Sequence, residues 1–500
     1  MAPASAAIVA SDTERPQVAQ GLQFGDMTLG NTMLWSRADR SARLFAEYSF
    51  DEAFSQPVRL VGPHALESTD FTARLDLAGL PADRTVYVRA WFESLTTKRA
   101  SSEVLQGRFR TPALQRSVRF VWGGDTAGQG WGINPSFGGM KIYEQMRRVQ
   151  PDFFLHSGDT IYADGPIAAT VTAENGQTWQ NIVTPEVAKV AETLDEFRGR
   201  YRYNLLDENV RRFNAEVPQI WQWDDHEVTN NWSGSKNLAN DGRYTVKDVP
   251  LLIARGGRAF MEYAPMRPYG ATELERVYRH IPYGPLLDVF VIDMRSYRGA
   301  NSANVQPEES EATRILGPAQ VAWLKDALRR SRATWKVIAS DMPIGLNVGD
   351  GSVGGVPQWE AVANGNNGPA LGRELEIAGV LRAIRQMAVR NVVWLTADVH
   401  YCAAHEYAPS RARFTDFDPF WEFVAGPLNA GTFGPNSLDA TFGPRVDFQK
   451  APPPGASNYS PYAGMQFFGE VNIDAASRTF TVMFKDLNGQ DIYRRTLNPA

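Results

Sequence analysis

The sequence contains a single cysteine, Cys402, among its 500 residues. One cysteine excludes an intramolecular disulfide and any zinc site built from paired cysteines. A chain of this length folds without disulfides, so cysteine usage does not identify the compartment.

The sequence also lacks long apolar runs and a surplus of basic residues. No stretch of about 18 apolar residues occurs, which excludes a hydrophobic transmembrane helix. The formal net charge is -5, with 21% charged residues. This balance argues against a nucleic-acid-binding surface, because such a surface must be basic.

The first residues lack the basic region and the long apolar region of an export signal. Two interpretations are open: a cytosolic protein, or an exported protein whose signal has been removed. The small residues at 2–7 resemble the start of a chain from which a signal has been cleaved, and we therefore expect a periplasmic or secreted protein. The sequence does not indicate an oligomeric state.

Apolar residues are plentiful, at 43% hydrophobic and 11% aromatic, so the chain can bury a large core. Its length favours two domains. Residues 15–115 alternate apolar and polar residues in short runs separated by turns, which predicts an immunoglobulin- or fibronectin-like β-sandwich ending in a linker at 111–116. Residues 116–500 form the second predicted domain.

The pattern changes after Ser117, where apolar runs are each followed by an acidic residue. Alternation of such runs with helical segments, such as 141–148, predicts a layered α/β domain with a buried sheet. Ligands of these sheets bind beyond the carboxyl ends of the strands. The runs 118–122, 152–156, 217–223, 335–339 and 391–396 place Asp125, Asp159, Asp225, Asp341 and Asp398 at such ends.

Three short motifs carry the chemistry: Gly158-Asp159-Thr160-Ile161-Tyr162, Trp223-Asp224-Asp225-His226-Glu227 and Asp398-Val399-His400. The glycine of the first motif permits a sharp turn, so that Asp159 can bridge two cations and the phenol of Tyr162 can face the same place. Taken alone, Asp159 is as consistent with a turn or a helix cap, and Tyr162 with a core residue.

Together, the motifs have the order and spacing of the calcineurin-like metallophosphoesterase superfamily. The Asp-Asp-His-Glu form, the β domain in front, and the segments 293–298 and 316–324 resemble the alkaline phosphatase D (PhoD-like) family within it. This resemblance covers nearly the whole chain. It implies a four-layer metallophosphoesterase sandwich behind the N-terminal β domain, and a binuclear metal centre.

The resemblance also assigns ligands. The first site would use Asp125, Asp159, Tyr162 and His400, and the second Asp159, Asp225, Asp341 and Asp398. Phenolate favours Fe³⁺ and an all-oxygen site favours Ca²⁺, so we expect an Fe³⁺–Ca²⁺ pair, with other divalent ions as alternatives. Some relatives carry a cysteine near the position of Asp125, which leaves the first metal open.

His226 and Asp225 are the expected catalytic residues, with His226 donating a proton to the leaving group. The alternative is that His226 only orients a metal-ligating carboxylate. Asn231 and Arg295 are candidates for binding substrate phosphate, with a turn and an ion pair as their respective alternatives.

The resulting hypothesis is a phosphoric ester hydrolase that cleaves phosphomonoesters and phosphodiesters by attack of a metal-bound hydroxide. Its expected partners are small phosphate esters. The alternatives are a phospholipase D-type phosphodiesterase or phosphotriesterase on the same site, and a non-catalytic envelope-binding module. The Gly-, Asn- and Pro-rich stretches 346–369 and 426–460 are expected to border the pocket.

Overall fold

The computed structural model describes residues 11–269, 273 and 275–500. The N-terminal part is a β-sandwich in which a four-stranded sheet, ordered β4-β3-β6-β7, faces the strands β1, β2 and β5. Its strands are β1 (Leu22–Thr28), β2 (Asn31–Arg37), β3 (Ala42–Ser49), β4 (Val58–Ala65), β5 (Thr72–Ala78), β6 (Thr85–Ser94) and β7 (Leu105–Arg110).

One sheet of the sandwich continues into the rest of the molecule. Strand β1 pairs in parallel with β12 through Gly25 and Gln219, which joins β1, β2 and β5 to a nine-stranded sheet. The order of that sheet is β24-β23-β22-β8-β9-β12-β1-β2-β5. Its other members are β8 (Val118–Gly123), β9 (Phe153–Ser157), β12 (Gln219–Gln222), β22 (Phe467–Ile473), β23 (Phe480–Asp486) and β24 (Asp491–Leu497).

A seven-stranded sheet with the order β13-β14-β15-β18-β20-β19-β21 packs against the nine-stranded sheet. Its strands β14, β15, β18 and β20 run parallel to one another. The members are β13 (Arg279–Gly284), β14 (Leu287–Val291), β15 (Trp335–Ala339), β18 (Val392–Thr396), β19 (Cys402–Tyr407), β20 (Phe420–Val424) and β21 (Pro444–Lys450).

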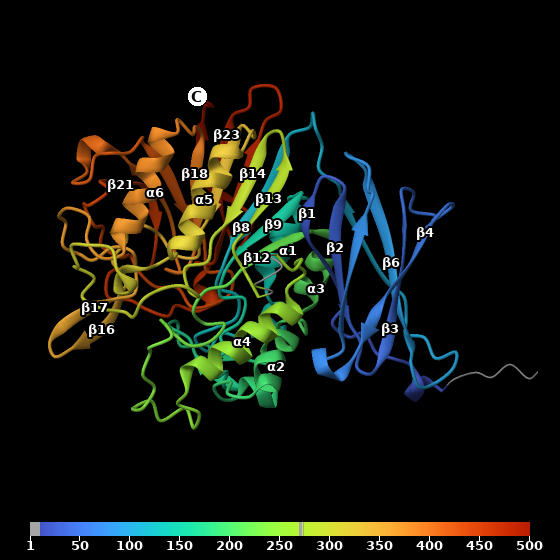
Figure 1. The fold of residues 1–500 in the computed structure, drawn as a ribbon. Helices are drawn as coiled ribbons and strands as arrows, with labels where there is room; N and C mark the ends of the chain where they lie inside the picture. Colours follow the sequence, from blue (N-terminus) through green and yellow to red (C-terminus); the bar gives the residue numbers. More distant parts are fainter. Residues whose placement is uncertain (1–10, 270–272, 274) are drawn as a thin grey trace, which may run out of the picture.

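Helices cover the two outer faces, and Figure 1 shows them on opposite sides of the paired sheets. Residues of α1–α4 form one core with the nine-stranded sheet, and residues of α5 and α6 form another with the seven-stranded sheet. The helices are α1 (Lys141–Arg148), α2 (Leu194–Asn204), α3 (Glu208–Glu216), α4 (Val249–Tyr263), α5 (Pro318–Arg330) and α6 (Glu374–Gln386).

The central core lies between the sheets and includes Phe120 and Leu155 from one and Val337 and Leu395 from the other. The result is the four-layer α/β/β/α sandwich that the resemblance implies, with an all-β N-terminal part. Two small hairpins, β10 (Thr170–Thr172) with β11 (Thr178–Gln180) and β16 (Gly349–Val353) with β17 (Val356–Trp359), extend from the loops.

Among the described residues, no helix is both long and apolar enough to cross a membrane.

Candidate metal centre

Five aspartates and one histidine expected to bind metal follow parallel strands of both sheets. Parallel strands end at one edge, so residues that are distant along the chain meet there. Three follow the nine-stranded sheet and three the seven-stranded sheet: Asp125 after β8, Asp159 after β9, Asp225 after β12, Asp341 after β15, and Asp398 and His400 after β18.

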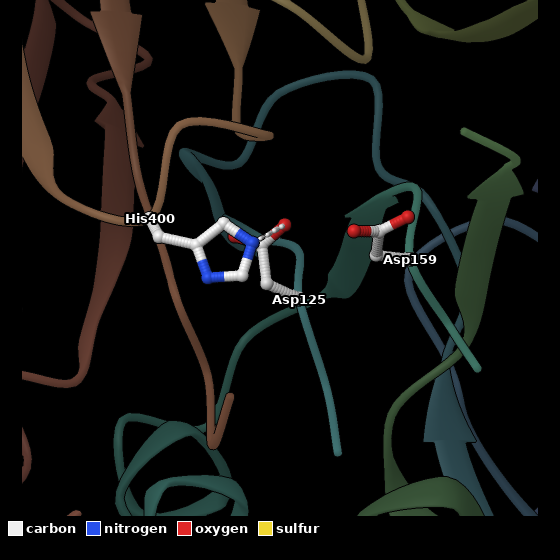
Figure 2. A group of neighbouring side chains, drawn as sticks. All are labelled: Asp125, Asp159 and His400. Atoms are coloured by element: carbon white, nitrogen blue, oxygen red, sulfur yellow. Dashed lines mark ion pairs between the residues drawn. The ribbon is translucent and has the colours of Figure 1, made fainter. Parts of the chain in front are cut away.

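Asp125, Asp159 and His400 form the first cluster. Ligand atoms of the three residues lie within 4.8 Å of one another, and Figure 2 shows the side chains converging from three separate loops. His400 Nε2 lies 3.8 Å from Asp125 Oδ1. The hydroxyl of Tyr162 lies 3.0 Å from the same nitrogen. All four residues assigned to the first site are therefore neighbours in the structure.

Two further clusters adjoin the first. One contains Asp159, Asp225 and His226, and the other contains Asp224, Asp225 and Asp398. Asp159 belongs to two of the three clusters, and so does Asp225. Asp341 is outside these clusters.

Asp341 is completely buried, with its Oδ2 3.3 Å from Nε of Arg295. Its Oδ1 is buried and has no hydrogen-bond partner in the described part of the chain. Asp341 therefore lies beside an arginine that partly neutralises it, at the margin of the expected second site.

The backbone is strained where four of the ligands sit. Asp125, Asp159, Asp398 and His400 have φ values of 64°, 51°, 69° and 60°. Non-glycine residues rarely adopt this left-handed conformation, which costs on the order of 1 kcal/mol or more per residue. Such strain concentrates at functional sites, where the surrounding structure holds a side chain in a required position.

The carboxylates of this region outnumber the positive groups beside them, Arg295 and His226. Both side-chain oxygens of Asp125, Oδ2 of Asp224 and Oδ1 of Asp225 are buried without a hydrogen-bond partner among the described residues. Burial, together with the neighbouring carboxylates of Glu360 and Asp225, raises the pKa of Asp398 to about 8. Buried anions of this kind are tolerated when paired or bound to metal. The donor set therefore fits cations.

His400 is oriented as a ligand. Its Nδ1 lies 2.6 Å from the carbonyl oxygen of Gly431, so Nδ1 carries the proton and the lone pair of Nε2 faces the Tyr162 hydroxyl. Burial lowers the pKa of His400 to about 4, which keeps the imidazole neutral at pH 7. Gly431 lies in 426–460, one of the stretches expected to border the pocket.

His226 is held by an aspartate that the sequence did not single out. Its Nδ1 lies 2.6 Å from Oδ1 of Asp164, and its ring stacks on Tyr162 at 4.3 Å between centroids. Burial would lower the pKa of His226, but the carboxylates of Asp164, Asp225 and Asp159 outweigh it and raise that pKa well above its ordinary value. The imidazole is thus held as a proton carrier beside the clusters.

Arg295 and Asn231, the candidates for substrate binding, are both engaged by protein groups. The Arg295 side chain is 0% exposed and pairs with Asp224, Glu360 and Asp341. The ion pair named as its alternative is therefore present, although buried. The backbone N–H of Asn231 donates to Oδ2 of Asp225 at 2.5 Å, and its side-chain amide donates to Asp350 at 3.0 Å.

Four acidic residues at the site were not assigned a role from the sequence: Asp164, Asp224, Glu227 and Glu360. Glu227 accepts hydrogen bonds from the backbone N–H groups of Thr160 and Asp224, at 2.6 and 2.8 Å, and so ties two ligand loops together. Asp224 and Glu227 lie inside a recognised motif, which is a usable signal. Glu360 has no such signal, because it stands alone in a loop.

The cysteine and two further buried histidines lie outside the clusters. Cys402 is buried in the core of β19, where burial raises the pKa of its thiol, and it belongs to none of the clusters found among the described residues. His156 hydrogen-bonds to Thr126 at 2.9 Å behind the first cluster. His405 pairs with the buried Glu422.

Comparison with known proteins gives consistent matches. Residues 120–484 match the model of the PhoD-like phosphatase family, and residues 2–113 match that of the PhoD-like phosphatase N-terminal domain. Alkaline phosphatase D of Bacillus subtilis (strain 168) is 27% identical over 405 residues, 76% of this chain. The match spans 64% of the length of that relative.

Two solved structures share the fold. The structure of PhoD has a TM-score of 0.70 at 20% identity, covering 98% of this chain and 90% of that one. The purple acid phosphatase PPD1 from yellow lupin (Lupinus luteus) seeds has a TM-score of 0.58 at 11% identity, covering 97% and 74%.

Proposed function

The chain belongs to the PhoD-like phosphatase family, and on that premise we propose that it is a metal-dependent hydrolase of phosphomonoesters and phosphodiesters. The observation that carries this proposal is the convergence of buried, partly unpaired carboxylates on Asp159. Two of the three acidic clusters share this residue. Together, the clusters carry more negative charge than the neighbouring arginine balances.

We assign the proposed metal ligands in two sets. Asp125, Asp159, Tyr162 and His400 would hold Fe³⁺, since phenolate, carboxylate and a neutral imidazole suit a hard trivalent ion. Asp159, Asp225 and Asp398, with Asp341 at the margin, would hold Ca²⁺, since their donors are all oxygen. Asp224 joins the second set through its cluster with Asp225 and Asp398. Bound cations would polarise the phosphate and lower the pKa of water.

The protein groups around the clusters have distinct proposed parts. Asp164 fixes the ring of His226, which donates its proton to the leaving oxygen. Asn231 holds the carboxylate of Asp225 through its backbone N–H, and its side-chain amide would have to leave Asp350 to contact substrate phosphate. Arg295 offsets the charge of Asp224 and Asp341; contact with substrate phosphate would require it to leave those partners.

Metal analysis together with an activity assay tests this function. The purified protein should contain two metal equivalents, absorb visible light through a phenolate–iron transition, and release phosphate from p-nitrophenyl phosphate. Tyr162→Phe should remove the absorption band. A protein that retains full activity after exhaustive chelation, or that binds no metal, would contradict the proposal.

Further proposals concern the domain boundary, the substrates and the cellular location of the protein. We place the domain boundary near residue 115, where the segment 111–117 contains no helix or strand. Small phosphate esters are the proposed substrates, and a periplasmic or secreted location is proposed from the similarity to alkaline phosphatase D. Cell fractionation would test the location.

A further inference from the structure

A cavity of about 360 Å³ opens beside His226, at the edge of the ligand clusters. Gln129 and Tyr162 line one part of it. Asn230, Lys236 and Arg243, from the loop that joins β12 to α4, line another. The cavity is thus bounded by the proposed proton donor, by Tyr162 of the first proposed metal site, and by side chains further along the loop that carries Asp225.

The position of His226 indicates which part of a substrate this cavity would hold. In an in-line displacement at phosphorus, the leaving oxygen lies opposite the attacking group, and a proton donor must lie next to it. His226 lines the cavity and also belongs to a cluster with Asp159 and Asp225. A phosphate held at the clusters would therefore direct its leaving group past His226 into this space.

We propose that the cavity is the leaving-group subsite, and that it selects a neutral leaving group rich in hydroxyl or amide groups. This inference rests on the proposed phosphoesterase function. The hydrogen-bonding groups come from two amides: Asn230 is exposed, and Oε1 of Gln129 is buried without a partner in the part of the chain that the structure describes.

The charges around the cavity are already balanced, which is why a neutral group fits better than an anion. Arg243 pairs with Asp241 at 2.7 Å, and Asp164 pairs with His226. Lys236 donates to the carbonyl oxygen of Asn230 and lies 3.8 Å from Asp350. These pairs leave no strong surplus of positive charge to attract an acidic group.

The size and polarity of the cavity further restrict the class of leaving group that it would accept. A volume of about 360 Å³ is near the lower end of the range of about 300–1,000 Å³ for small-molecule sites, which suits a single monosaccharide-sized group. A site built to hydrogen-bond its substrate discriminates against analogues that lack the bonding groups, since its own polar atoms would be left unpaired. Aryl leaving groups should therefore gain nothing from Asn230.

Asn230→Leu tests the subsite when two substrates are compared, glucose 6-phosphate and p-nitrophenyl phosphate. We expect kcat/KM for the sugar phosphate to fall about tenfold, as for one lost hydrogen bond, and kcat/KM for the aryl phosphate to change less than about twofold. Asn230→Gln, which keeps the amide, should recover most of the sugar phosphate activity. The matched control is Asn240→Leu, an exposed asparagine of the same loop that does not line the cavity.

The outcomes separate the inference from the function on which it rests. If the metal-loaded wild-type protein hydrolyses neither substrate, the proposed function is wrong. If it hydrolyses both, and Asn230→Leu lowers both equally or neither, the subsite is wrong. Thermal melting of each variant shows whether the fold is intact, and competitive inhibition by free glucose, weakened only in Asn230→Leu, gives a second readout of the same space.

Discussion

The seam between the N-terminal strands and the rest of the protein buries charged side chains, as the candidate metal centre does. In the seam, Asp26 of β1 and Arg279 of β13 are both 0% exposed and form an ion pair at 2.7 Å. Asp70 is paired in the same way with Arg37 at 2.8 Å and with Arg202 at 2.7 Å. Each of these buried carboxylates has a cation supplied by the protein.

The buried carboxylates of the candidate metal centre are paired differently. Arg295 faces Asp224, Asp341 and Glu360 together, and a second buried arginine, Arg298, also pairs with Glu360. Asp125 and Asp159 have no arginine or lysine partner among the ion pairs of the described residues. In the seam, the buried carboxylates are already paired with arginines of the protein. At the metal centre, negative charge is in excess, and a bound cation would balance it.

Asp159→Asn should have the largest effect. Asp159 is shared by two clusters, so its loss weakens both proposed metal sites, and kcat/KM should fall by at least about 10³-fold. The melting temperature of the metal-free protein should not fall, because the substitution removes one of several crowded negative charges. Assay and calorimetry of the metal-free and loaded forms measure both quantities. Asp195→Asn, at an exposed position, is the control.

Asp26→Asn should show the opposite behaviour. Removing one partner of a fully buried ion pair leaves Arg279 uncompensated, which should lower the free energy of unfolding by about 3–5 kcal/mol. The activity of each folded molecule should change little. Urea denaturation measures the loss of stability, and unchanged unfolding would show that the seam is not held by this pair.

The metal-free protein should lose stability as the pH rises. In the absence of metal, burial raises the pKa of Asp341 to about 6 and that of Asp398 to about 8. The folded state then binds protons that the unfolded chain has released, so the free energy of unfolding falls between about pH 4 and pH 8. The slope is at most about 1.4 kcal/mol per pH unit for each group.

Bound metal should abolish this slope, since the carboxylates would then be ionised by coordination rather than protonated. Urea denaturation at several pH values, with and without a chelator, measures the difference between the two forms. If the free energy of unfolding changed with pH equally in both forms, the carboxylates responsible would not belong to the metal centre.

Asp350→Asn should have the smallest effect. Asp350 accepts hydrogen bonds from the side-chain amides of Asn231, at 3.0 Å, and Asn301, at 2.8 Å. Asn231 in turn holds the carboxylate of Asp225. The loss of such an outer partner should weaken metal binding at the second site about tenfold. Metal titration measures this, and Ser352→Ala on the same hairpin should leave affinity unchanged.

Much of the fold could be predicted from local pattern. The apolar runs at 118–122, 335–339 and 391–396 correspond to β8, β15 and β18, and the helix expected at 141–148 is α1. The strands could be predicted because buried parallel strands are continuously apolar. The pairing of β1 with β12 could not be predicted from the sequence, because it depends on one residue pair between distant segments.

The site residues divide in the same way. Asp125, Asp159 and Asp398 were found because each follows an apolar strand within or beside a short motif. Asp164 and Glu360 were not, because no motif assigns them a role, although Asp164 lies two residues after Tyr162 and Glu360 lies in the stretch 346–369. Asp164 contacts His226, and Glu360 contacts Arg295. Each contact joins residues that are more than 60 positions apart in the sequence.

By itself, the sequence determined where strands end and which acidic residues stand at those ends, since both depend on neighbours along the chain. Only the tertiary structure decided which of those acids would be neutralised by arginine and which would be left for a cation. That division depends on burial and on distances between segments that meet only when the sheets pack, because a charge is costly to bury wherever no opposite charge lies within a few ångströms.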